Sequence, residues 1–72
     1  MNLSENFKTE LAKIYADNKP GRREHILTAT ARLRAKYNAK LVNARRDDPS
    51  GAATAELAIV RIENEHAAKL AA

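Results

Sequence analysis

The stretch PGRREHILTATARLRAKYNAKLVNARR, residues 20–46, decides how this chain folds. Its apolar residues follow one another in steps of seven, four, four and three: Ile26, Leu33, Tyr37, Leu41 and Ala44. Residues at these spacings lie on one face of an α-helix, and Thr30 fills the one turn that lacks an apolar residue. We therefore expect a single helix over 20–46, which at 1.5 Å per residue would be about 40 Å long.

The same stretch carries most of the positive charge of the chain. The whole chain has a net charge of +4. The segment 19–46 holds Glu24 as its one acidic residue, whereas the segments 1–18 and 47–72 are both net acidic. The basic residues of the central segment are Lys19, Arg22, Arg23, Arg32, Arg34, Lys36, Lys40, Arg45 and Arg46. A modest net charge thus hides a strongly polarised molecule.

Length and composition favour one small domain, residues 1–72, that works together with a second subunit. Chains below about 70–80 residues usually need disulfides, a metal ion or a partner subunit for stability. There is no cysteine, and the two histidines, His25 and His66, fall in different predicted helices. We therefore expect no metal site and no cofactor, and oligomerisation remains as the stabilising device.

Helix-breaking residues divide the chain into three predicted helices. The two glycines and two prolines fall at Pro20-Gly21 and within 49–51. The expected helices cover about 4–17, 20–46 and 49–70. Because the last two are joined by a short link, they should lie antiparallel. The predicted fold is all-α: a short N-terminal helix and a long antiparallel helical hairpin.

Polar residues and prolines at the breaks predict the helix starts. Asn2 or Ser4 can cap the first helix, and Asn2 with Glu5 has capping-box spacing. Asn18 or Lys19 would precede Pro20 at the first position of the second helix. Asp48 followed by Pro49 predicts the start of the third helix, with Ser50 as a competing cap.

The third helix has an apolar surface wider than one neighbouring helix requires. One stripe contains Ala55, Ile59, Ile62, His66 and Leu70, and a neighbouring face adds Ala53, Leu57, Val60 and Ala67. We expect two hairpins to bury the extra faces as a homodimeric four-helix bundle, with the first helices as flanking arms. The alternative is a monomeric three-helix bundle in which the first helix covers the same surface. The predicted assembly residues are Leu33, Tyr37, Leu41, Leu57, Ile59 and Ile62.

Arg32, Lys36 and Lys40 form a basic row in steps of four along the second helix. Such a row can bind an acidic protein surface or the phosphates of a nucleic acid. The alternative is a solvated face, partly neutralised by Glu56, Glu63 and Glu65 of the third helix. The predicted partner-binding residues are Lys19, Arg22, Arg23, Arg32, Lys36 and Lys40.

The sequence predicts no catalytic site. Ser4 and Ser50 stand where helix caps are expected, and His66 falls on the apolar stripe, where a hydrogen-bonded edge histidine is expected. The two long helices and their proline-containing link do not fit a helix-turn-helix. No stretch approaches the ~18 apolar residues of a membrane span, and a cytoplasmic location is the expectation.

Two segments have a familiar pattern: Arg22-Arg23-Glu24 leading to Ala31-Arg32-Leu33, and residues 50–57, SGAATAEL, leading to Glu63. Together they resemble small helical accessory proteins of temperate tailed phages and phage satellites. The resemblance implies a small effector that binds a phage or host protein and inhibits or redirects it. Targets in that class include transcription regulators, packaging or replication components and defence proteins. A DNA- or RNA-binding regulator that contacts phosphates is the alternative function.

Overall fold

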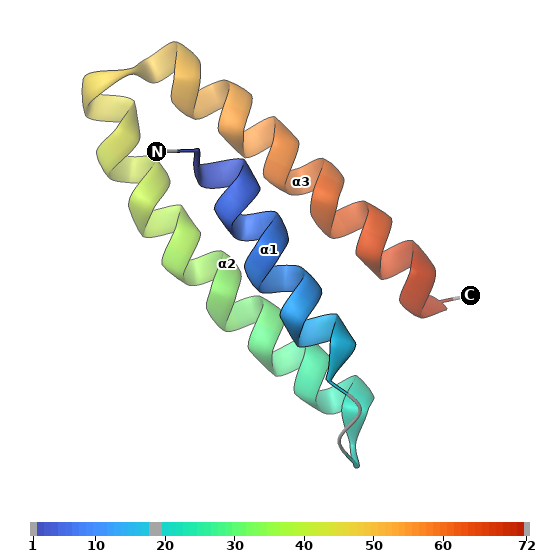
Figure 1. Cartoon of the computed structure of the whole chain (residues 1–72). Helices are drawn as coiled ribbons and strands as arrows, with labels where there is room; N and C mark the ends of the chain where they lie inside the picture. Colours follow the sequence, from blue (N-terminus) through green and yellow to red (C-terminus); the bar gives the residue numbers. More distant parts are fainter. Residues whose placement is uncertain (1, 18–19, 72) are drawn as a thin grey trace.

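The computed structural model describes residues 2–17 and 20–71, and these residues form three helices and no strand. The helices are α1 (Leu3–Ala16), α2 (Arg22–Asp47) and α3 (Pro49–Ala71). The helices α2 and α3 form an antiparallel hairpin, and α1 packs against both of them (Figure 1). The molecule is elongated, with extents of 42 × 19 × 15 Å. The prediction of an all-α fold with these three helices is confirmed.

The first helix begins where its polar cap predicts. Asn2 has an extended backbone, and its side-chain oxygen accepts hydrogen bonds from the backbone N–H of Glu5 at 3.3 Å and from the hydroxyl of Ser4 at 2.8 Å. These bonds satisfy a donor that the first helical turn leaves free. Asn2 is therefore the cap, and Ser4 lies inside the helix.

The second helix begins at Arg22, later than the expected start at Pro20. Gly21 precedes it with a φ of 72°, in the left-handed region that glycine adopts without a steric penalty. Because this residue turns the chain, regular helical hydrogen bonding starts only after it, with the N–H of His25 donating to the carbonyl of Gly21 at 3.0 Å. The caps proposed from the sequence, Asn18 and Lys19, lie outside the described residues.

Asp48 is the one residue between α2 and α3. Its backbone N–H donates to the carbonyl of Ala44 at 2.8 Å, and its carboxylate accepts from the N–H of Gly51 at 3.0 Å. Pro49 is the first residue of α3. The Asp48-Pro49 start is thus confirmed, whereas Ser50 lies within the first turn of the helix.

The buried core is made by all three helices of one chain. The ring of Phe7 meets the ring of Tyr37 edge-on, with 5.2 Å between centroids. Around this pair lie Leu11 of α1, Leu33 and Leu41 of α2, and Ile59 of α3. Such a core requires α1 to sit on the hairpin.

This packing changes the expected role of the predicted assembly residues. Leu33, Tyr37, Leu41 and Ile59 are buried inside the single chain, and Ile62 packs against their cluster. They contact α1 and each other, because α1 covers the inner face of the hairpin. Of the six predicted assembly residues only Leu57 stays on the surface, with 69% of its area exposed.

Candidate interaction surface

The basic row, defined as Arg32, Lys36 and Lys40, lies on the flank of α2 next to α1. The ammonium of Lys36 is 3.1 Å from a carboxylate oxygen of Glu10 in α1. The ammonium groups of Lys36 and Lys40 stand 5.9 Å and 5.8 Å from the centre of the Tyr37 ring. Both distances allow an attractive cation–π interaction. The structure therefore brings the three predicted cations together on one edge.

Arg32 is the freest member of the basic row. Its side chain is exposed, and no residue in the described part of the chain pairs with it. It borders a shallow hollow of about 300 Å³, together with Lys36 and the apolar residues Ile14 and Leu33. A partner that approaches Arg32 would meet apolar surface beside the charge.

Glu10 anchors the basic row and was not singled out from the sequence. The hydroxyl of Tyr37 donates to its carboxylate, and this bond is the largest cause of a lowered pKa of Glu10. Burial opposes that effect, while Lys36 adds to it. Burial, followed by the bond to Glu10, raises the pKa of Tyr37 to about 12. At neutral pH Glu10 is charged and Tyr37 is a neutral donor, so one of the three positive charges is offset.

On the opposite flank of α2, the positive charges are neutralised by α3. Arg34 pairs with Glu63 and lies 4.0 Å from Glu56. Arg45 pairs with Glu56 at 2.7 Å. The alternative of partial neutralisation by the third helix thus holds for this flank through Glu56 and Glu63. Glu65 is exposed and makes no ion pair within the described residues.

The remaining predicted binding residues do not extend the basic row. Arg22 is partly buried, and its guanidinium donates to the carbonyl of Tyr15 at 2.8 Å, which links α2 to the end of α1. Arg23 is exposed and borders a separate hollow with Ala67 and Leu70 of α3. Lys19 lies outside the described residues. Since neighbouring residues on a helix point about 100° apart, Arg22 and Arg23 face different sides.

The two histidines make structural contacts. The Nδ1 atom of His66 is 3.0 Å from the carbonyl oxygen of Ile62, and its ring lies 4.9 Å from the ring of Tyr15. The Nε2 atom of His25 is 3.5 Å from the carboxylate of Asp17. In the described part of the chain, no three histidine, aspartate or glutamate side chains come together as metal ligands would.

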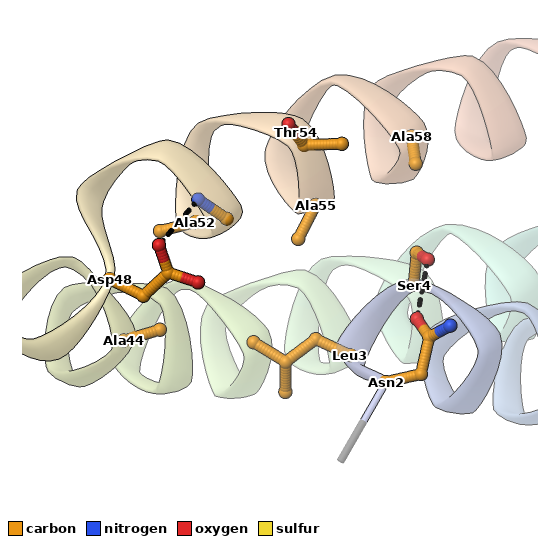
Figure 2. Close-up of a pocket in the computed structure, with 10 residues that line it drawn as sticks. Asn2, Leu3, Ser4, Ala44, Asp48, Ala52, Thr54, Ala55 and Ala58 are labelled. Atoms are coloured by element: carbon orange, nitrogen blue, oxygen red, sulfur yellow. Dashed lines mark hydrogen bonds between the residues drawn. The ribbon is translucent and has the colours of Figure 1, made fainter.

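A hollow lies at the closed end of the hairpin, next to the start of α1 (Figure 2). Its volume is about 580 Å³, and small residues dominate its lining, among them Ala44, Ala52 and Ala55. The polar side chains here bond to neighbouring helix residues: Ser4 donates to Asn2, Asp48 accepts from Gly51, and Thr54 donates to the carbonyl of Ser50. This hollow therefore offers neither a nucleophile with a base nor a charged ligand set.

No described helix is both long enough and apolar enough to cross a membrane. Comparisons of the chain with protein-family models, with curated proteins and with solved structures give no match.

Proposed function

We propose that this chain is a small non-enzymatic effector that binds an acidic surface of another protein through the basic row. The observation that carries the proposal is the alignment of Arg32, Lys36 and Lys40 on one edge, with Lys36 and Lys40 placed beside the Tyr37 ring. Tyr37 is itself buried in the core, so the row has a rigid support. A preorganised row of cations loses less side-chain freedom on binding than flexible lysines do.

Binding would follow from charge first and from shape second. Opposite charges steer two proteins together and fix their register, while the partly exposed Ile14 adds apolar contact area once water leaves. The effector inhibits or redirects its target by occupying a functional surface of that protein. No group of the effector needs to take part in a reaction.

A tagged chain used as bait in an extract of its native host, followed by mass spectrometry, tests this function. The wild type is compared with the triple variant Arg32→Ala, Lys36→Ala, Lys40→Ala. The matched control, Lys8→Ala, Arg46→Ala, Lys69→Ala, removes the same charge from exposed residues on three different helices. The proposal expects a specific protein that the row variant loses and the control keeps. A protein retained equally by both variants would contradict it.

The nucleic-acid alternative predicts a different outcome for the same two variants. Binding directed at phosphates should appear with duplex DNA or RNA at about 50 mM salt and weaken steeply as the salt concentration rises. If the wild type shows such binding and the row variant loses it, the partner of the basic row is a nucleic acid and not an acidic protein. Tyr37 is only 3% exposed, so stacking with bases does not support this alternative.

The effector is further proposed to work as a homodimer of hairpins in a four-helix arrangement. Since α1 occupies the inner face of the hairpin, the pairing must use the outer face. Two exposed large apolar residues, Leu57 and Val60, lie one helical turn apart on α3. This distribution supports an association through the hairpin and leaves the edge of the basic row free.

A further inference from the structure

The helix α3 has two apolar stripes, and the chain covers only one of them. The inner stripe contains Ala52 and Ile59, which are buried, and Ile62, which is partly buried. A helix that is apolar on two faces normally has a neighbour on each. The second stripe therefore needs an explanation beyond the fold of one chain.

The second stripe, called here the outer seam, is exposed along its whole length. Its residues follow in steps of four, three, four and three: Ala53, Leu57, Val60, Asn64 and Ala67. Leu57 is 69% exposed and Val60 is 39% exposed. Alternating steps of three and four are the spacing of the contact positions a and d in a coiled coil, with Leu57 and Asn64 at a and Val60 at d.

We propose that two copies of this chain pair in parallel through their outer seams. The proposal rests on the proposed homodimer, not on the binding role of the basic row. In a parallel pair each a position meets the same position of the second copy. Asn64 would then face Asn64, and two amide side chains can donate and accept between themselves. A single asparagine at position a is a known device for fixing register and number of strands.

Charge complementarity beside the seam also favours a second copy as the occupant. Glu56 precedes Leu57 at position g, and Arg61 follows Val60 at position e. In a parallel pair a g residue lies near the e residue of the other helix, so Glu56 of each copy would meet Arg61 of the other. Arg61 is exposed and makes no ion pair in the described part of the chain. Glu56 can accept this third cation because 40% of its side chain is exposed.

The size of the seam sets the expected strength of the dimer. The seam runs for about four helical turns and contains only two large apolar side chains per copy. A contact of this extent is at or below the ~1,200 Å² limit that separates weak interfaces from standard ones. We therefore expect dissociation in the micromolar range, and a folded monomer on dilution.

Sedimentation equilibrium between about 1 and about 500 µM tests the proposal, with the wild type passing from monomer to dimer. Leu57→Glu is expected to weaken the dimer at least about tenfold, because it sets a charge in the centre of the contact. Val42→Glu is the matched control: it puts the same charge on an exposed apolar residue of α2. Circular dichroism checks that both variants keep their helix content.

Each outcome decides a different part of the proposal. A wild type that stays monomeric up to the highest concentration would overturn the dimer and the seam together. A dimer that Val42→Glu disrupts and Leu57→Glu leaves intact would overturn the seam alone. The triple variant of the basic row should dimerise like the wild type, so loss of partner binding is measured independently of this interface.

A cysteine placed on the seam tests the orientation, since the chain has no cysteine of its own. Asn64→Cys is expected to form a disulfide-linked dimer quickly under mild oxidation, because equal a positions lie within bonding distance in a parallel pair. The exposed Ala35→Cys on α2 is the control and should cross-link slowly. Equal rates for the two variants would overturn the parallel arrangement.

Discussion

Asp48 and Gly51 depend on one another at the start of α3. A Cβ atom on Gly51 would clash with the carboxylate of Asp48, so Gly51→Ala must push this side chain out of its capping position. Loss of the cap costs about 1 kcal/mol, and alanine in place of glycine stabilises a helix by about as much. We expect little net change in the wild type. In an Asp48→Ala background, the same substitution should stabilise the chain by up to about 1 kcal/mol.

Urea denaturation of the wild type, the two single variants and the double variant measures how far the effect of Gly51→Ala depends on Asp48. The change in the free energy of unfolding on Gly51→Ala should differ between the two backgrounds by about 1 kcal/mol, which is the contribution of the cap. An identical effect of Gly51→Ala with and without Asp48 would show that the carboxylate does not cap the helix in solution.

The Tyr37–Glu10 pair makes stability depend on pH at both ends of the scale. The pKa of Glu10 lies below its ordinary value of 4.5, chiefly because of the hydrogen bond from Tyr37, so the stabilisation is present above that value and is lost as the pH falls through the folded-state pKa. The pKa of Tyr37 is raised to about 12, mainly by burial, so its stabilisation is complete below pH 10 and is lost as the pH rises towards 12.

Tyr37→Phe removes the titrating group on the alkaline side and the largest cause of the lowered pKa of Glu10 on the acid side. We expect a loss of about 1 kcal/mol at neutral pH, from the missing hydrogen bond, and weaker destabilisation in acid and in alkali than the wild type shows. Thermal unfolding from pH 3 to pH 11 measures the two slopes. Tyr15→Phe is the control, because Tyr37 and Glu10 remain in it. If the loss of stability in alkali persists in Tyr37→Phe, another titrating group is its cause.

At the scale of the element, α1 holds the molecule together although it is the shortest helix. Phe7 is fully buried against Tyr37. Phe7→Ala should cost about 3–5 kcal/mol, since it leaves a cavity between all three helices. The free energy of unfolding of a chain of this length is roughly 4–11 kcal/mol in total. The variant should therefore be close to unfolding at room temperature.

Chemical denaturation and binding of a dye specific for exposed apolar surface measure the loss of α1 packing in Phe7→Ala. Lys8→Ala changes the neighbouring, exposed position and should stay within about 0.5 kcal/mol of the wild type. A Phe7→Ala chain as stable as the wild type would show that the hairpin is stable without the packing of α1 against it.

The elements could be predicted from sequence to the extent that local chemistry decides them. Asn2 and Asp48 cap helices by short-range hydrogen bonds, and apolar spacing identifies the long helix. The start of α2 was misplaced because Gly21, not Pro20, determines where the backbone becomes helical. Local chemistry also cannot tell whether the apolar edge of α1 packs on its own hairpin or on another chain, because both choices bury the same residues.

The candidate site could also be predicted only in part. The basic row could be predicted because steps of four place side chains on one face of any helix. Its anchoring to Glu10, and the use of Arg22 as a bridge to Tyr15, depend on how α1 meets α2. No spacing within a helix carries that information, so these two contacts could not be predicted.

At the scale of the whole molecule, the folded chain has three distinct surfaces, although their residues alternate along the same helices. The inner face of the hairpin is occupied by α1, the α1–α2 edge carries the basic row, and the outer seam faces away from the core of the same chain. Since no buried residue of the core is shared with the outer seam, dimerisation and binding of an acidic partner can occur together. A dimer would present two basic rows, which would strengthen binding to any target with two acidic sites.

This separation predicts that one chain folds without its partner. Every member of the buried cluster is covered by helices of the same chain, so the Leu57→Glu variant should be a folded monomer that unfolds in one cooperative step. Its thermal midpoint should rise less between about 5 and about 200 µM than that of the wild type, because the variant dimerises more weakly. Calorimetry measures both midpoints. A Leu57→Glu chain without a cooperative transition, while Val42→Glu unfolds normally, would mean that two copies share one core and that α1 alone does not complete it.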